Sequence, residues 1–432
     1  MDDRQGFRAL YANAKGQILD YPGMGMLGRS AMEWVEPLRE EMIPLPRGAV
    51  LVSIPGQRPV AGEAGRAVVI KNAPGGGAAQ AVGALLPQGF TRTLFPAGVS
   101  PDPHNVLPLF GYAAVGFRDE KIWVAAVQSD EHRKWHPRFY NTVQLPAYIN
   151  RLQRKYPENR ILKQLSHCAL NYGCYTAQNI FYRRWEGGIP TMRACNADCI
   201  GCISEGHEKI DSPQQRLGFQ PSVEEISQVG SEHLAKAREG IISFGQGCEG
   251  EPSLNAVDIA AAISRIRCQT DRGTININTN AGYTEGIIRL CRAGLDAMRV
   301  TIFSCRQENY QIYHRPKNYR WDDVGRSVSS AKEAGLDVSL NLLVFPGFTD
   351  REEEIEALLA WVKQKQVDMI QLRNLNIDPD LLFRHVPDGG TAIGISNFLY
   401  VLQQELPAVR IGSYTHPVKT EKARPSERQI TS

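Results

Sequence analysis

The chain lacks the features of a membrane or secreted protein. In its 432 residues no apolar run approaches the roughly 18 to 20 residues that a membrane helix needs, and residues 1–5 contain no signal-like apolar core. Charge of one sign is also lacking: 49 Lys and Arg against 46 Asp and Glu leave +3, which gives no overall argument for nucleic acid or membrane binding. Nine cysteines are an odd number for a disulfide framework, so we expect a reducing compartment and a cytoplasmic protein.

What is present is the composition of an ordinary globular protein. Hydrophobic residues make up 42% and aromatic residues 8%, and the length suffices for two domains or for one large barrel with an extension. The pattern changes along the chain, which suggests four parts. These are a β-rich N-terminal domain of unknown role (residues 1–145), a basic helical bridge (146–189), an α/β core (190–400), and a helix end with a disordered tail (401–432).

Turns separate short apolar runs in residues 48–133, as expected for strands, whereas residues 30–41 are predicted to form a helix. The bridge is basic, with eight Lys or Arg and two Glu from Arg151 to Arg193. A second basic, aromatic stretch covers residues 314–321. Both could contact an anionic polymer such as RNA, although a solvated surface is the simpler interpretation.

Residues 190–400 alternate between strand and helix patterns. Strands are predicted at residues 190–193, 241–244, 274–278, 298–303, 338–345 and 369–372. This order predicts a parallel sheet that curls into a partial barrel or stays open. In both cases ligands bind at the carboxyl ends of the strands, so we expect the chemistry to follow each strand.

Three cysteines follow the first of these strands: Cys195, Cys199 and Cys202, in a Cys-x3-Cys-x2-Cys spacing. Thiolates this close together suit a metal centre, and an iron–sulfur cubane held by three of them keeps one iron open to a small molecule. A structural zinc ion is the alternative, with His207 or a distant cysteine as its fourth ligand, in a protein that binds nucleic acid or protein.

The spacing resembles the signature loop of the radical S-adenosylmethionine (SAM) superfamily. The resemblance implies a partial (β/α)6 barrel and a [4Fe–4S] cluster whose open iron binds the amino and carboxylate groups of SAM. It also implies reductive cleavage of SAM to a 5′-deoxyadenosyl radical, which abstracts hydrogen from a substrate, and an electron donor such as a flavodoxin or ferredoxin. The family commonly has an aromatic residue where this chain has Gly201, so another side chain should cover that side of the cluster.

The turn after the second strand resembles the family's Gly-Gly-Glu-Pro motif, which implies that Gly250 and Glu251 contact the SAM amino group. Glu249 replaces the preceding glycine, and the sequence leaves open whether it shares that contact. The resemblance implies further SAM contacts for polar residues near later strand ends: Thr279, Ser304 and Asn341.

Other cysteines also follow predicted strands. Cys248 and Cys305 are expected at the same edge of the sheet, where either could act catalytically or ligate a second cluster, although a spare thiol is the simpler interpretation. Cys168 and Cys174 could likewise serve a second cluster, with core packing as the simpler alternative. The substrate stays open between RNA, a peptide and a small metabolite. A sensor that binds the cluster without cleaving SAM is the alternative to an enzyme.

Overall fold

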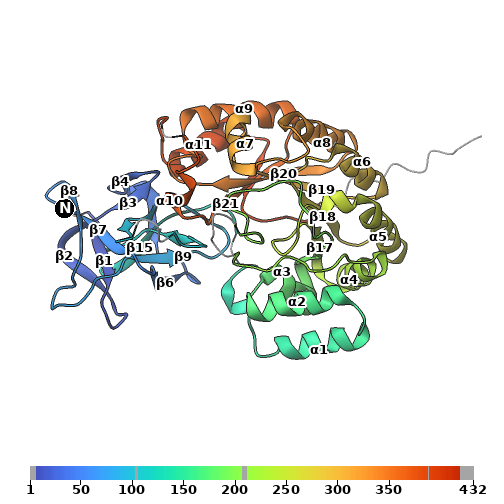
Figure 1. Ribbon diagram of the computed structural model, residues 1–432, viewed down its shortest axis with the longest axis horizontal. Helices are drawn as coiled ribbons and strands as arrows, with labels where there is room; N and C mark the ends of the chain where they lie inside the picture. The colour runs from blue at the N-terminus through green and yellow to red at the C-terminus, as the bar shows by residue number, and fades with distance from the viewer. Residues whose placement is uncertain (1–5, 103–105, 132, 207–211, 388, 419–432) are drawn as a thin grey trace, which may run out of the picture.

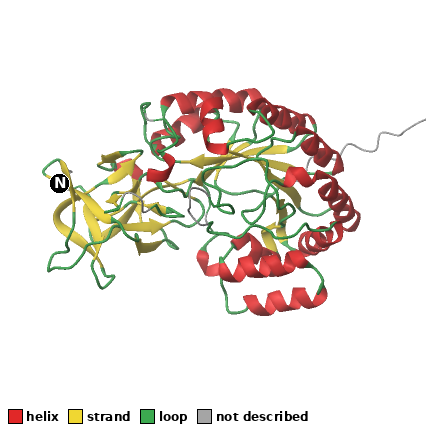
Figure 2. Ribbon diagram, in the orientation of Figure 1, coloured by secondary structure: helices red, strands yellow, loops and turns green. Residues whose placement is uncertain are grey.

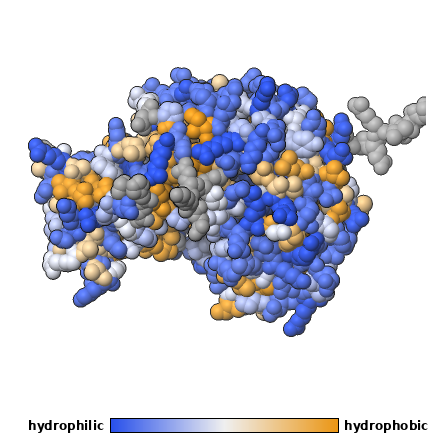
Figure 3. All heavy atoms as spheres, in the orientation of Figure 1, coloured by the Kyte–Doolittle hydropathy of each residue, from blue (hydrophilic) through white to orange (hydrophobic). Residues whose placement is uncertain are grey.

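The computed structural model describes residues 6–102, 106–131, 133–206, 212–387 and 389–418. Figure 1 shows two parts side by side, a β-rich N-terminal part and an α/β part, with three helices at the edge of the latter. None of the helices in these ranges is both long and apolar enough to span a bilayer. Figure 3 shows that hydrophilic side chains cover much of the visible face of the α/β part.

The N-terminal part consists of short antiparallel strands. They are β1 (Arg8–Ala12), β2 (Ile18–Met26), β3 (Gly28–Ser30), β4 (Glu33–Val35), β5 (Met42–Pro44), β6 (Val50–Ser53), β7 (Arg58–Glu63), β8 (Arg66–Val69), β9 (Val82–Leu85), β10 (Phe90–Arg92), β11 (Phe95–Pro96), β12 (Gly98–Val99), β13 (Tyr112–Ala113), β14 (Val115–Arg118) and β15 (Lys121–Gln128). The main sheet has the order β10-β15-β14-β1-β2-β7-β12, and two three-stranded sheets complete this part.

The helix predicted for residues 30–41 is wrong. The segment forms the β3–β4 hairpin, in which Arg29 pairs with Trp34, followed by a single 3-10 turn, Arg39–Glu41. Ala31 at the hairpin has a φ of 50° and donates its N–H to the Pro346 oxygen at 3.0 Å. A contact with a residue more than 300 positions away therefore overrides the local preference.

Three helices connect the two parts: α1 (Leu145–Lys155), α2 (Arg160–Asn171) and α3 (Tyr175–Tyr182). Their basic residues have partners on α4 (Val223–Lys236): Lys155 and Arg183 both bind Glu232, and Arg160 binds Glu225. The excess of positive charge seen in the sequence is thus partly neutralised within the chain.

The α/β part is a curled, all-parallel sheet with helices on its outer face (Figure 2). Its strands, in spatial order, are β16 (Arg184–Gly188), β17 (Arg238–Phe244), β18 (Thr274–Thr279), β19 (Ala297–Ile302), β20 (Asp337–Val344), β21 (Met369–Asn374) and β22 (Arg410–Gly412). Its helices are α4, α5 (Ala256–Gln269), α6 (Thr284–Ala293), α7 (Gln307–His314), α8 (Trp321–Glu333), α9 (Glu352–Lys365), α10 (Pro379–Leu382) and α11 (Ile395–Glu405). The predicted α/β partial barrel with a β-rich N-terminal extension is confirmed.

Local signals define many of these elements. The Ser222 hydroxyl accepts the Glu225 N–H at 3.2 Å while the Glu225 carboxylate accepts the Ser222 N–H at 2.8 Å, the predicted capping box at the start of α4. Gly294, with a φ of 103°, ends α6 in the left-handed conformation that glycine adopts easily.

The two ends of the parallel sheet differ from the prediction. The first strand is β16, not residues 190–193, because Pro190 has no N–H for a ladder. At the other end, residues 410–416, assigned from sequence to the end region and tail, form β22 and a buried segment in which the Thr415 hydroxyl donates to Glu186 at 3.1 Å. The rest of the predicted tail, residues 419–432, lies outside the described residues.

The N-terminal part packs on the carboxyl edge of the parallel sheet. Aromatic and aliphatic side chains of both parts form one buried cluster, which includes Phe95, Phe110, Ile200, Phe303, Tyr313, Phe345, Phe348, Leu375 and Ile377. Phe95 lies against Phe345, with ring centroids 4.5 Å apart. The edge at which we expect the chemistry is therefore partly covered by the N-terminal part.

A buried cation joins the two parts. Arg92 is only 1% exposed. Its Nη1 donates to the backbone oxygens of Phe110 and Tyr112 at 3.1 and 3.0 Å. Its Nη2 donates to the Leu375 oxygen, beyond β21, at 2.7 Å. Burial lowers the pKa of Arg92 to about 9, so the guanidinium stays charged at neutral pH. Three backbone oxygens of the interface thus depend on one side chain.

We expect Arg92→Met to lower the free energy of unfolding by about 3 kcal/mol, because three buried oxygens lose a charged donor. Urea denaturation followed by tryptophan fluorescence measures this loss. The control is Arg66→Met on exposed β8, for which a change within about 0.5 kcal/mol is expected. Equal effects of the two substitutions would contradict the assigned role of Arg92.

Candidate active site

The cysteine loop lies between β16 and α4, against the end of α7. The N–H groups of Asp198 and Ile200 donate to the oxygens of His314 and Tyr313, both at 3.0 Å. The N–H of Lys317 donates to the Asn196 oxygen at 2.9 Å. The backbone of the loop is therefore anchored on both sides of Cys199. The basic stretch at residues 314–321 holds this loop, and His314 and Tyr319 within it are buried.

The three thiols of the loop influence one another electrostatically. Burial, then the neighbouring sulfurs of Cys195 and Cys202, raise the pKa of Cys199 well above its ordinary value. Burial, then the Glu251 carboxylate, raise the pKa of Cys195 to about 11. Without metal these two groups are thiols, and a bound metal centre would displace their protons.

The donor set suits an iron–sulfur cluster better than a zinc ion. Within the described ranges, no three His, Cys, Asp or Glu side chains surround a single-ion position. A zinc ion needs its ligands within about 2.3 Å of one point, whereas each iron of a cluster takes one thiolate. His207, the fourth zinc ligand considered from sequence, lies outside the described residues.

His314 directs a ring N–H at Cys199, which the sequence did not reveal. Its Nε2 accepts the Phe303 N–H at 3.2 Å, and its Nδ1 lies 3.3 Å from the Cys199 sulfur. Burial lowers the pKa of His314 to about 3, so the ring is neutral and carries one proton. Because Nε2 is an acceptor, that proton is on Nδ1 and points at sulfur.

A second donor approaches Cys202. Nη2 of Arg216 lies 3.9 Å from the Cys202 sulfur, and the same guanidinium pairs with Glu205 at 2.5 Å. Donors of this kind stabilise thiolate ligands and tune the electronic properties of a metal centre. Neither Arg216 nor His314 has a spacing to the cysteines that would signal such a role.

Tyr313 occupies the space beside Gly201. A Cβ atom at residue 201 would lie 2.6 Å from the Tyr313 hydroxyl oxygen. The Tyr313 ring stacks on Phe303, with centroids 4.5 Å apart, and Phe303 stacks on Phe348 at the same distance. An aromatic side chain from α7 thus stands next to the residue at which the family commonly has one.

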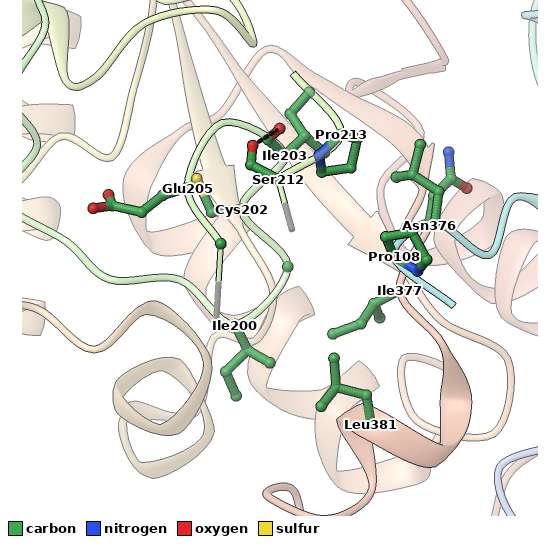
Figure 4. Close-up of a pocket in the computed structure, with 13 residues that line it drawn as sticks. Pro108, Ile200, Cys202, Ile203, Glu205, Ser212, Pro213, Asn376, Ile377 and Leu381 are labelled. Carbon is green, nitrogen blue, oxygen red and sulfur yellow. Dashed lines mark hydrogen bonds between the residues drawn. The ribbon is translucent and has the colours of Figure 1, made fainter. Parts of the chain in front are cut away.

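The outer side of the loop faces the N-terminal part. Figure 4 shows a small pocket of about 30 Å³ in which Ile200 and Cys202 share the wall with Pro108, Ile377 and Leu381. Segments from both parts of the molecule therefore limit the space around the third cysteine.

Glu249 joins the cysteine loop to the turn after β17. One oxygen accepts the N–H groups of Gly245 and Gln246 at 2.6 and 2.9 Å. The other accepts the N–H and hydroxyl of Thr191 at 2.6 and 2.9 Å, and the Met192 N–H at 3.1 Å. Burial raises the pKa of Glu249 to about 7, although these five donors favour its ionised form. The carboxylate holds the backbone and is fully occupied.

Gly250 permits the close approach of this turn to the cysteine loop. A Cβ atom at residue 250 would lie 2.0 Å from the Ala194 oxygen. The Gly250 N–H donates to the Met192 oxygen at 2.7 Å, and the Glu251 N–H donates to the Ala194 oxygen at 2.8 Å. Two backbone hydrogen bonds therefore place Glu251 beside Cys195.

Glu251 and Thr279 lie together. One Glu251 oxygen accepts the Ser253 N–H at 2.9 Å and the Thr279 hydroxyl at 2.6 Å, and the other accepts the Asn280 N–H at 2.8 Å. The Asn280 amide also donates to the Asn196 side chain at 2.7 Å, which links the turn after β18 to the cysteine loop. A carboxylate has about four lone-pair directions, so Glu251 can accept one more donor.

Two other residues selected from sequence have different surroundings. The Ser304 hydroxyl donates to Glu354 of α9 at 2.6 Å, so it is engaged with the helical layer. Asn341 of β20 is half-buried and donates to the Thr301 hydroxyl at 3.1 Å. Neither makes a hydrogen bond to the cysteine loop that the structure records.

Cys248 and Cys305 are both buried, in different surroundings. Cys305 belongs to the main apolar core, and burial followed by the Glu354 carboxylate raises its pKa. Cys248 lies in the turn after β17, where interaction with the Cys168 thiol and burial raise its pKa.

A polar network inside the half-barrel was also missed from sequence. Glu186 of β16 accepts from the Ser243 hydroxyl at 2.7 Å and pairs with Arg299 of β19 at 3.3 Å. Arg299 in turn donates to Gln371 of β21 at 3.0 Å. The sequence signal that could have located this network is a charged residue within a strand that otherwise reads as apolar, such as Arg299 in β19.

We expect Glu249→Gln to lower the free energy of unfolding by about 2 to 4 kcal/mol, because the amide would direct N–H groups at backbone donors. Thermal unfolding of the metal-free protein measures the change. Glu224→Gln, on the exposed face of α4, is the matched control and should change stability by about 0.5 kcal/mol or less. A Glu249 effect as small as the control would contradict the role of this carboxylate.

For protein reconstituted with an iron–sulfur cluster on the cysteine loop, we expect His314→Gln to lower the midpoint potential of that cluster on the order of 50 mV. A hydrogen bond that stabilises the reduced cluster by about 1 kcal/mol more than the oxidised cluster corresponds to a shift of this size for a one-electron couple, and the substitution removes that bond. His314→Asn is the matched control, because its amide can keep a donor near the Nδ1 position. Potentiometric titration followed by electron paramagnetic resonance (EPR) compares them, and an unchanged potential in His314→Gln would refute the contact.

Known proteins share the α/β part of the chain. Residues 189–361 match the family model of the radical SAM superfamily. GTP 3′,8-cyclase of Haemophilus influenzae is 26% identical over 179 residues, which is 40% of this chain and 49% of that protein. Probable GTP 3′,8-cyclase of Methanosarcina mazei is 29% identical over 199 residues, which is 45% of this chain and 55% of that protein. The chain thus spans about half the length of these curated relatives.

Solved structures give weaker likenesses. The FeFe-hydrogenase maturase HydG of Carboxydothermus hydrogenoformans aligns with a TM-score of 0.35 and 18% identity, covering 62% of this chain and 70% of HydG. Streptococcus suis SuiB bound to SAM aligns with a TM-score of 0.35 and 12% identity, covering 60% and 57%. Scores this low leave the assignment to the family model and the sequence matches. These matches identify residues 189–361 as a radical SAM domain.

Proposed function

We propose that Cys195, Cys199 and Cys202 hold a [4Fe–4S] cluster and that the protein cleaves SAM reductively to start a radical reaction. The observation that carries the proposal is the cysteine loop itself, anchored at the carboxyl edge of a parallel sheet with an N–H of His314 directed at Cys199. When bound, such a cluster supplies the electron that breaks a carbon–sulfur bond of SAM and yields the 5′-deoxyadenosyl radical.

The surrounding residues would prepare the loop for this cluster. His314 and Arg216 supply donors to two of the sulfurs, which favours thiolate ligands. Tyr313 and Phe303 form an aromatic wall beside Gly201, which excludes water from that side. A radical site needs such exclusion, because water and stray protons open side reactions.

For SAM, we propose Glu251 as the partner of the amino group. It is buried next to Cys195, and its three recorded donors leave room for an ammonium group. Thr279 would act by holding Glu251 in place. Asn341 remains a candidate for a SAM contact, whereas Ser304 is already bound to Glu354 and Glu249 is occupied by backbone donors.

The substrate proposal is limited to a chemical class. Three bridge cations, Lys155, Arg160 and Arg183, pair with carboxylates of α4, which removes part of the argument for RNA. We therefore favour a small metabolite or a peptide, reached at the edge that the N-terminal part partly covers. Reduction would come from a flavodoxin or ferredoxin. All nine cysteines are free thiols, which is consistent with a reducing compartment such as the cytoplasm.

Release of 5′-deoxyadenosine from SAM by anaerobically reconstituted protein under dithionite tests the proposal. We expect Cys199→Ala to reduce release by about 100-fold or more, because the cluster loses a ligand. Cys268→Ala, which removes an exposed thiol, should retain the parent activity.

A parent protein that carries iron and sulfide but releases no 5′-deoxyadenosine would instead favour the cluster-binding sensor. Zinc in place of iron after anaerobic purification would favour the structural-zinc alternative. Both outcomes contradict the proposed reaction.

A further inference from the structure

A second group of three cysteines lines one cavity beside the cysteine loop. Cys168 lies near the end of α2, Cys174 precedes α3, and Cys248 follows β17. The three residues border a cavity of about 370 Å³, and the Cys174 N–H donates to the Cys168 oxygen at 3.0 Å. Interaction with the Cys248 thiol lowers the pKa of Cys168 to about 7. Residues distant in sequence thus bring three sulfurs to one space.

The cavity does not have the features of a closely packed apolar core. Gln246 and Arg373 also line it, and Nε2 of Gln246 is buried without a hydrogen-bond partner. Cys174 lies 3.3 Å from the Thr176 hydroxyl. A thiol-lined pocket with an unpartnered buried amide nitrogen can accept a bound group.

The chemistry of the donors selects the class of ligand. Thiolates prefer soft metals, chiefly zinc and the iron of iron–sulfur clusters. Among the residues that the structure describes, no three potential ligands surround a single-ion position. The volume exceeds what one ion needs, and the cationic Arg373 at its border can balance thiolate charge.

We propose that Cys168, Cys174 and Cys248 bind a second iron–sulfur cluster of the four-iron type. Three thiolates leave one of its irons without a protein ligand. Rotation of the Cys168 and Cys248 side chains would separate their sulfurs when the cluster binds.

The proposed site adjoins the first one. Ile203, the residue after Cys202, lines the cavity, and a Cβ atom at Gly247 would lie 2.5 Å from its side chain. The Leu217 N–H donates to the Cys248 oxygen at 2.8 Å. The segment that follows the cysteine loop therefore contacts both groups of cysteines.

The experiment uses the full chain without the ligands of the first site: Cys195→Ala, Cys199→Ala and Cys202→Ala combined. After anaerobic reconstitution with ferrous iron and sulfide, we expect about four irons in this variant and about eight in the parent. EPR of the dithionite-reduced sample should show a cluster signal in both. Because the first site is absent, this result does not depend on SAM cleavage.

The six remaining cysteines supply a matched comparison in the same background. Removing Cys168, Cys174 and Cys248 should abolish the remaining iron, whereas removing Cys268, Cys291 and Cys305 should leave it in place. Circular dichroism and thermal unfolding check that both variants are folded.

The proposal is overturned if the background variant binds no iron, or if its iron survives removal of the cavity cysteines. It is likewise overturned if zinc occupies the cavity, or if mass spectrometry finds a Cys168–Cys248 disulfide in the anaerobically purified parent. The first of these outcomes, no iron in the background variant, can be measured even if the variant that also lacks Cys168, Cys174 and Cys248 fails to fold.

Discussion

One buried carboxylate, Glu249, carries the constraint on which the candidate site depends. It accepts hydrogen bonds from the backbone of Thr191, just before the cysteine loop, and of Gly245, just after β17. No strand pairing joins these two segments. Together with the backbone hydrogen bonds from Gly250 to Met192 and from Glu251 to Ala194, Glu249 holds Glu251 beside Cys195, and Gly250 provides the room. The residue that replaces a family glycine is thus a structural element of this chain, and the neighbouring glutamate is the one left with capacity for a ligand.

The end of helix α7 also positions the cysteine loop. Its last two residues bind the loop through their backbone oxygens and also face it with their side chains, Tyr313 toward Gly201 and His314 toward Cys199. Backbone geometry and sulfur environment are therefore set by the same two residues. Displacement of this short helix would alter both at once.

Periodic signals predicted most of the parallel sheet, because strands buried under helices read as continuous apolar runs. The β3–β4 hairpin and β22 were missed because their stability comes from distant partners, Pro346 in one case and β21 in the other. The loop cysteines could be predicted as ligands because they are close together in sequence. His314 was not identifiable, since its role depends on a ring orientation that only the Phe303 N–H reveals. Likewise, the role proposed for Cys168 and Cys174 depends on Cys248, which lines the same cavity but is distant in sequence.

The position of Arg92 has a consequence for folding during synthesis. The strand that carries it emerges from the ribosome early, but its partner Leu375 is made more than 280 residues later. Until then, Arg92 has only its Phe110 and Tyr112 acceptors, and the aromatic surface around Phe95 lacks Phe345. The N-terminal part therefore completes this interface only when translation has nearly ended, and until then its apolar surface is exposed to aggregation.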